Sequence, residues 1–196
     1  MTLVLASKSA ARAQILRGAG VAFEIRSAAV AEGPLKAAAL AKGEAPRHIA
    51  ESLAEAKAVA ASRGTTDWTI GADQTLEFEA RLFDKAETEE QARACLQTLR
   101  GKTHQLHAAV ALARDGRVVW RNTQSATLTM RPFSDAFLEA YLRRNPEIAT
   151  GCVGGYALEE EGVQLFEAIE GDYFTVLGLP ILPLLAELRR QGLVPA

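Results

Sequence analysis

Two long segments of alternating apolar and polar residues, joined by Asp115-Gly116, place the tightest constraint on the fold. The alternation runs over residues 106–114 and again over 118–130. A period of two is typical of strands with one face in a core, and Asp-Gly between two such runs favours a two-residue hairpin turn. We therefore predict that a long antiparallel hairpin forms part of a sheet.

The segments on either side of this hairpin predict single strands interleaved with helices. This order indicates an α/β chain with a mixed sheet, and the length of 196 residues without repeat or linker favours a single domain spanning 1–196. Strands are expected at 3–6, 21–27, 68–78 and 163–169, and helices at 10–18, from Pro34 to about 43, and at 46–62, 88–99, 134–144 and 180–191.

Charge and hydropathy exclude several classes of protein. The chain has 22 Lys and Arg against 24 Asp and Glu, with both signs interspersed, which argues against a nucleic-acid or membrane surface. No apolar run approaches 18 residues, and the N-terminus lacks the pattern of a signal peptide. Cys95 and Cys152 have unrelated contexts, so we expect reduced thiols and a cytoplasmic protein.

Polar residues follow the ends of several apolar segments. Ser7, Ser9 and Arg12 bracket the start of the first predicted helix, where backbone N–H groups, hydroxyls and a guanidinium suit an anion. Four further residues could supply carboxylates for a metal or water and cations for phosphates, although each also fits a helix cap or a solvated surface charge. They are Glu32, Lys57, Asp73 and Lys85.

His104 and His107 raise the question of a metal site. On a strand, an offset of three places them on opposite faces, so we predict no metal pair but one surface and one half-buried histidine.

A resemblance to a known family rests on motifs spread over nearly the whole chain. Residues 5–16, LASKSAARAQIL, resemble the opening motif LASxSPRRxxLL of the Maf family of nucleoside triphosphate pyrophosphatases. Further blocks follow in the family's order: 30–32 (VAE, similar to VDE), 54–58 (AEAKA), 70–75 (IGADQT), 84–86 (DKA, similar to GKP), 99–104 (LRGKTH), 155–159 (GYALE) and 169–180 (IEGDYFTVLGLP).

The resemblance implies a fold related to the inosine triphosphate pyrophosphatases, with an elongated mixed sheet flanked by helices and a cleft between two lobes. It implies hydrolysis between the α and β phosphates of a nucleoside triphosphate, giving the monophosphate and pyrophosphate, with Mg²⁺ or Mn²⁺. A homodimer is a further expectation. Carried over residue by residue, the catalytic group is Asp73, Lys57 and Lys85; the substrate-binding group is Ser7, Ser9, Arg12, Gln74 and Glu159; and the metal ligands are Glu32 and Asp73.

Departures from the motifs bear on activity and on the choice of base. Ala10, Ala11, Ala31 and Ala86 replace Pro, Arg, Asp and Pro of the family pattern, and the loss of an arginine weakens expected phosphate binding. Gln74 and Glu159 resemble the 7-methyl-GTP type of the family rather than the dTTP and UTP type. A carboxylate is a suitable acceptor for the N1–H and amino group of guanine.

Two functions from different classes follow. The leading hypothesis is a pyrophosphatase acting on noncanonical or modified nucleotides. The alternative is a regulator of cell division or septum formation that binds a nucleotide or a protein with little turnover.

Overall fold

The computed structural model describes residues 2–27 and 29–195. In this part of the chain, seven strands form one mixed sheet in the order β2-β1-β3-β5-β6-β7, with β4 paired to β3. Strand β1 runs parallel to β2 and β3, and the other pairs are antiparallel. The strands are β1 Leu3–Leu5, β2 Glu24–Ile25, β3 Trp68–Phe78, β4 Arg81–Phe83, β5 Thr103–Arg114, β6 Arg117–Met130 and β7 Phe166–Glu170. The predicted mixed α/β fold is confirmed.

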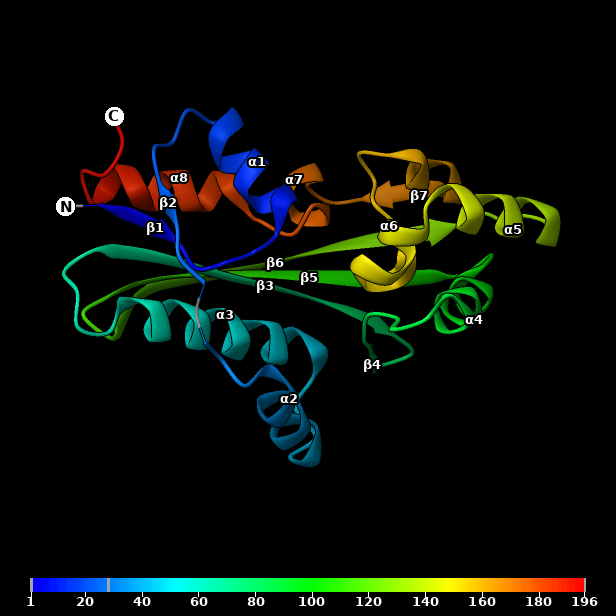
Figure 1. The fold of residues 1–196 in the computed structure, drawn as a ribbon, viewed down its shortest axis with the longest axis horizontal. Coiled ribbons are helices and arrows are strands. Elements are labelled where there is room, and N and C mark those ends of the chain that lie inside the picture. Colours follow the sequence, from blue (N-terminus) through cyan, green and yellow to red (C-terminus); the bar gives the residue numbers. More distant parts are fainter. Residues whose placement is uncertain (1, 28, 196) are drawn as a thin grey trace.

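Helices flank this elongated sheet (Figure 1). Helix α3 covers one face, α1 and α8 cover the other, and α4, α5 and α6 gather at the far end. The α-helices are α1 Ala10–Gly18, α2 Glu32–Ala41, α3 Pro46–Ser62, α4 Glu89–Leu99, α5 Asp135–Arg144, α6 Pro146–Gly151, α7 Tyr173–Val176 and α8 Ile181–Arg190, and the 3₁₀ helices are η1 Val153–Gly155 and η2 Glu161–Leu165. None of the helices described is both long and apolar enough to cross a membrane.

The hairpin predicted from Asp115-Gly116 is the longest strand pair. Asp115 and Gly116 both have positive φ, 49° and 71°, as a type I′ turn requires. Strands β5 and β6 pair from Thr103 opposite Thr129 to Arg114 opposite Arg117. This hairpin and β3, which pairs with β5, form the centre of the sheet, and helices pack on both of its faces.

Two hydrophobic cores divide the face of the sheet opposite α3 into two lobes. The first core packs Leu5, Ile70 and Leu184 with α1 and α8, and the second packs Leu76 and Tyr141 with α4, α5 and α6. Strands β3 and β5 contribute to both cores. The lobes therefore share long strands and meet along them.

On the other face, small residues let α3 lie very close to the sheet. Ala50, Ala54 and Ala58 of α3 pack on alanines 109, 111 and 113 of β5. A Cβ on Gly71 would lie 2.2 Å from the carbonyl oxygen of Ala54, so only glycine fits beneath the helix. This close approach fixes the position of every side chain that α3 directs toward β3.

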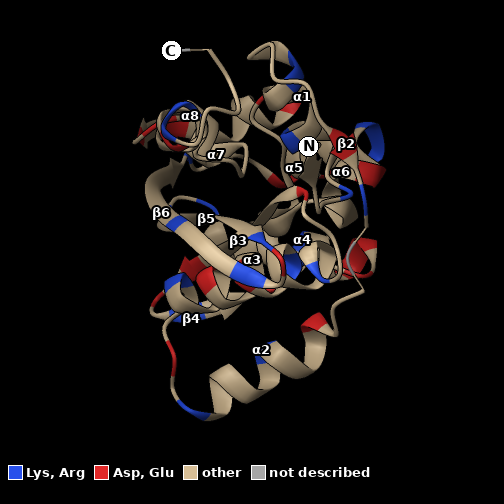
Figure 2. Cartoon of the chain, turned by 90° about the vertical axis from the view of Figure 1, so that its left-hand side faces the viewer, with Lys and Arg blue, Asp and Glu red and all other residues tan. Residues whose placement is uncertain are grey.

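Helix α2 lies beyond α3 in both views (Figures 1 and 2), where its Ala39 packs against Ile49 and Leu53 of α3. Basic and acidic segments are interspersed along the ribbon in Figure 2, as the sequence predicts.

Several local predictions are wrong. Helix α6 and strand β4 were not expected, β2 covers only Glu24–Ile25, and the predicted strand at 163–169 begins three residues later because η2 precedes it. Both histidines of β5 are buried, at 2% and 3% exposure for His104 and His107, although they do lie on opposite faces. The reason is that β5 is covered on both faces, by α3 on one and by the lobe cores on the other.

Candidate active site

The site lies where β1 ends and β3 continues beyond it, paired with β5 on its other side. The Ala6 N–H donates to the Ile70 carbonyl at 2.7 Å, and beyond this point β1 turns into the loop that leads to α1. Ser9 caps α1 by accepting from the Arg12 N–H at 3.4 Å, and Ser7 Oγ accepts from the Ser9 N–H at 3.2 Å. A helix N-terminus at the carboxyl end of a parallel strand is a favourable place for an anion.

Arg12 is held in one orientation by three acceptors far apart in the sequence. Its Nε donates to the carbonyl of Gly178 at 2.9 Å, and its Nη1 donates to the Ala72 carbonyl at 2.9 Å and to Ser7 Oγ at 3.2 Å. Burial lowers the pKa of Arg12, and the nearby carboxylates of Asp73 and Glu32 oppose this shift. A guanidinium stays charged in proteins, so Arg12 is a fixed positive charge beside two acids.

Lys57, Asp73 and Glu32 form the most tightly connected polar cluster of the site. Lys57 Nζ lies 2.5 Å from Asp73 Oδ1 and 3.1 Å from Glu32 Oε1. The side chains of Lys57 and Asp73 are only 12% and 10% exposed, whereas that of Glu32, the first residue of α2, is 45% exposed. Two carboxylates therefore converge on one ammonium next to the Arg12 guanidinium.

Gln74 points to the opposite face of β3 from Asp73 and binds the main chain of α7. Its Nε2 donates to the carbonyls of Thr175 and Val176 at 3.0 and 2.9 Å, which occupies both amide hydrogens. Along this face Gln74 lies between Ala72 of the first core and Leu76 of the second. Its Oε1 is the atom left to accept a hydrogen bond from a substrate.

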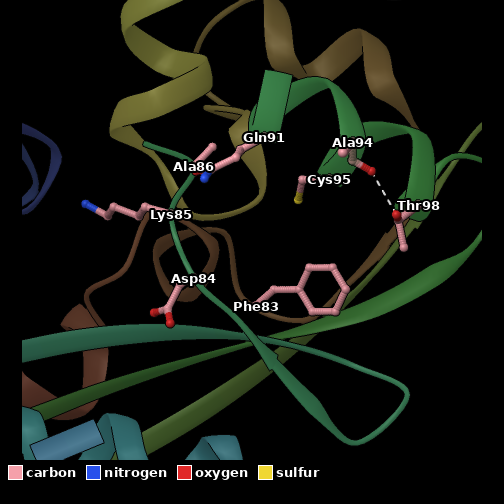
Figure 3. A pocket seen from close by; sticks show the side chains of 8 residues that line it. All are labelled: Phe83, Asp84, Lys85, Ala86, Gln91, Ala94, Cys95 and Thr98. Carbon is pink, nitrogen blue, oxygen red and sulfur yellow. Dashed lines mark hydrogen bonds between the residues drawn. The ribbon is translucent and has the colours of Figure 1, made fainter. Parts of the chain in front are cut away.

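Lys85 and Glu159 belong to the second lobe. Burial raises the pKa of the Cys152 thiol, while the charge of Lys85 lowers it and that of Glu159 raises it, so both side chains lie near this thiol. Lys85 is exposed, and its ammonium points away from a cavity of about 310 Å³ beneath α4 (Figure 3). The structure thus brings together Ser7, Ser9, Arg12, Glu32, Lys57 and Asp73. Gln74 lies on the opposite face of β3, near Arg12 at Gly178. Lys85 and Glu159 lie apart from this group, near Cys152.

Sequence reasoning missed a link between these two groups. Lys36 Nζ of α2 lies 2.6 Å from Asp84 Oδ1, in the segment that carries Lys85. Helix α2 therefore contributes Glu32 to one group and contacts the neighbour of Lys85 in the other. The two residues are 48 positions apart. No pattern in the sequence signals this pair.

The acidic residues suit a metal that takes few protein ligands. In the described ranges, no group of three or more His, Cys, Asp or Glu side chains could hold a metal ion by itself. Mg²⁺ is commonly held by one or two carboxylates together with waters and substrate oxygens. Glu32 and Asp73 both reach the Lys57 ammonium, so the two carboxylates lie close enough together to fit that requirement.

A partly buried arginine and lysine, two converging carboxylates and a helix N-terminus define an α/β enzyme that acts on a phosphorylated anion. The model of the Maf-like protein family matches residues 2–191, and the chain belongs to this family. A "Nucleoside triphosphate pyrophosphatase" of Caulobacter vibrioides is 55% identical to it over 97% of this chain and 96% of its own.

Other relatives are named for a narrower substrate. A "7-methyl-GTP pyrophosphatase" of Brucella abortus is 47% identical over 96% of each chain, and one of Rhizobium meliloti is 46% identical over 99% of this chain and 98% of its own. The predicted family is confirmed, and the chain is a nucleoside triphosphate pyrophosphatase, a hydrolase. The names of its relatives divide between general and methylated substrates.

Proposed function

We propose that this chain hydrolyses the bond between the α and β phosphates of a modified purine nucleoside triphosphate, releasing the monophosphate and pyrophosphate. Lys57 shared between Asp73 and Glu32, beside the fixed charge of Arg12, is the observation that carries the proposal. These groups supply both the cations that a triphosphate needs and the carboxylates that activate water.

Charge explains the division of roles. A triphosphate carries about four negative charges near neutral pH, so a nucleophilic water is repelled unless those charges are neutralised. Arg12 and Lys57 supply fixed positive charge on one side, and we assign Lys85 to the phosphates on the other. Ser7 and Ser9 hold the loop at the N-terminus of α1, where backbone N–H groups suit a phosphate oxygen.

Asp73 is the proposed proton acceptor for the attacking water. A carboxylate in this position removes the proton as the oxygen attacks phosphorus, and Lys57 holds that carboxylate in place from 2.5 Å. A divalent cation, when bound by Glu32 and Asp73, would neutralise phosphate charge and lower the pKa of a bound water. Asp73 can serve as base, as ligand or as both.

The preference for a 7-methyl-GTP-like purine over dTTP or UTP rests on Gln74 and Glu159. With both amide hydrogens of Gln74 donated to α7, only its Oε1 can receive a donor from a base. Glu159 is exposed and acts only as an acceptor when ionised. Guanine presents donors on one edge, so two acceptors favour it over thymine or uracil.

We further propose that residues 1–196 form one pyrophosphatase domain, because the two cores are built on the same strands, β3 and β5. Cys95 and Cys152 are free thiols, in keeping with the expected cytoplasmic location. A homodimer stays a prediction. The alternative function in cell division gains no support from these side chains.

The test is pyrophosphate release from a panel of nucleoside triphosphates, with Mg²⁺ or Mn²⁺ and with a chelator. We expect metal-dependent turnover and a higher kcat/KM for 7-methyl-GTP than for UTP in direct competition. A preference for UTP would overturn the assignment of the preferred nucleobase while leaving the general reaction intact. Turnover unchanged by the chelator would overturn the proposed role of Glu32 and Asp73 in holding a metal.

A further inference from the structure

A second polar constellation lies on the other flank of α3, at the edge of the sheet. His107 Nδ1 lies 2.7 Å from Ser125 Oγ, and His107 Nε2 lies 3.1 Å from Glu77 Oε2. Thr75, His107 and Ser125 stand opposite one another on β3, β5 and β6. Ser125 is therefore two strands from β3, about 10 Å at the usual strand spacing, and does not belong to the Asp73 cluster.

The hydrogen-bond directions in this constellation are determined. A carboxylate only accepts, so His107 Nε2 carries the hydrogen that goes to Glu77. In the neutral imidazole, His107 Nδ1 then has its lone pair free and accepts the hydroxyl hydrogen of Ser125. This is the order nucleophile, base, orienting acid that serine hydrolases use, here on adjacent strands of one sheet.

The protonation state of His107 suits a base. His107 is 3% exposed, and burial lowers its pKa, with a smaller opposing effect of Glu77 and a further lowering by Arg47. The imidazole is therefore neutral near pH 7 and can take up a proton.

Arg47 completes the arrangement at the hydroxyl. Its Nη1 donates to Ser125 Oγ at 2.8 Å, and its Nη2 donates to the Thr123 carbonyl at 2.7 Å, which fixes the guanidinium. An oxyanion formed on a carbon bound to Ser125 Oγ would lie within reach of the same guanidinium. Charged donors aimed at a developing oxyanion are an effective form of transition-state stabilisation.

Ser125 opens onto a cavity. Ser125 is an exposed residue, and β7 pairs with β6 only from Thr127 onward, so β7 does not cover the edge of β6 at Ser125. The cavity has a volume of about 260 Å³ and is lined only by polar residues: Arg47, Thr123, Gln124, Ser125, Asp172 and Thr175. That volume suits a small ester better than a whole nucleotide.

We propose that Ser125, His107 and Glu77 form a second catalytic site that hydrolyses small carboxylic esters. Ser125 Oγ attacks the carbonyl carbon while its proton passes to His107 Nδ1, and the C–O bond to the alcohol breaks as the alcohol takes that proton. Water then attacks the acyl carbon and gives one proton to His107. The bond to Ser125 Oγ breaks, the proton returns to Oγ, and the carboxylic acid leaves.

The experiment combines covalent labelling with turnover, on the full chain and without nucleotide. A fluorophosphonate probe should label Ser125, as located by peptide mass spectrometry, and p-nitrophenyl acetate should release p-nitrophenol. Ser125→Ala should abolish the label and lower ester turnover by about 10²-fold, while pyrophosphatase activity is retained. The matched control is Ser52→Ala, an exposed serine on α3, which should change neither the labelling nor the ester turnover.

A second variant tests whether Ser125 is labelled because His107 activates it or only because it is accessible to the probe. His107→Gln should keep pyrophosphatase activity, which reports the fold, and lose the Ser125 label. If it does not fold, Glu77→Gln replaces it, with the same expectation of a slower label. Absence of label on wild-type Ser125, or labelling unchanged in these folded variants, would overturn the proposal. Neither result would affect the pyrophosphatase assignment.

Discussion

The two lobes contribute different kinds of side chain to the proposed pyrophosphatase site. At the lobe of β1 and α1, with α3 on the other face of the sheet, the Arg12 guanidinium and the Lys57–Asp73 pair are largely buried and bonded to neighbours. In the lobe of α4, α5 and α6, Lys85 and Glu159 are exposed. The groups proposed for the chemistry are held by hydrogen bonds and ion pairs, whereas Lys85 and Glu159, proposed to meet the phosphates and the nucleobase, are exposed to solvent.

The largest effect is expected from the fixed lobe. Asp73→Asn keeps the size of the side chain but removes the proton acceptor, so turnover should fall at least about 10²-fold while nucleotide binding persists. Steady-state kinetics and equilibrium binding check this. Asp135→Asn, an exposed carboxylate paired with Arg100, is the control that should leave turnover unchanged. Near-normal turnover of the Asp73 variant with any accepted substrate would remove Asp73 from the chemistry.

Lys57→Met tests the bridge between the two carboxylates. The variant leaves Asp73 and Glu32 facing each other without their shared cation, so turnover should drop about 30- to 100-fold and unfolding should need about 1–3 kcal/mol less. Kinetics and denaturant unfolding measure the two effects, and Mg²⁺ should restore part of the stability. Lys42→Met, on the exposed end of α2, is the matched control. Unchanged kinetics would exclude Lys57 from the site.

The second lobe is expected to lose folding stability at acid pH. His104 donates or accepts at Tyr156 Oη over 2.7 Å, its Nδ1 is buried without a partner among the described residues, and burial lowers its pKa to about 4. As pH falls, the unfolded chain therefore takes up the proton first. Stability from this residue is complete above about pH 6.5 and declines from there toward pH 4.

At pH 5 this loss amounts to about 2 kcal/mol. Urea unfolding between pH 7.5 and 4.5 measures it, and His104→Gln should flatten the profile over this range. A wild-type profile that is already flat between pH 6.5 and 5 would contradict the expectation.

Lys85→Ala tests whether an exposed residue of the second lobe contributes to turnover without contributing to stability. Because the ammonium is exposed, its removal should change the free energy of unfolding by less than about 0.5 kcal/mol. Turnover of the triphosphate should still fall about tenfold, and more than that of an analogue with fewer phosphate charges. Kinetics on both substrates alongside thermal unfolding make the test. Equal losses on the two substrates would contradict a role at the phosphates.

The smallest effect concerns the preference between substrates rather than the rate of turnover. Glu159→Gln should reduce the preference for 7-methyl-GTP over UTP by about 5- to 10-fold, because the new amide donates as well as accepts and tolerates a uracil edge. Competition between the two substrates measures the ratio. A ratio identical to that of the wild type would show that Glu159 does not contact the base.

Local patterns were sufficient for the elements with strong signals. Strand β3 spans 68–78 as predicted, and α4 begins after Thr88, which accepts from the Gln91 N–H. The hairpin at Asp115-Gly116 has the expected turn. Strand β4 was missed because Glu79 and Ala80, with φ of 51° and 59°, make its turn without the Gly or Asn that normally signals positive φ.

By itself, the sequence determined the α/β class, the family and the identity of the polar residues at the ends of the apolar segments, since all of these depend on neighbours within a few positions. The tertiary structure decided which of those residues meet. Arg12 contacts Gly178 across 166 positions, and Gln74 donates to α7 rather than to open space. Such contacts follow from how strands pair and how closely α3 packs, and no local period encodes them.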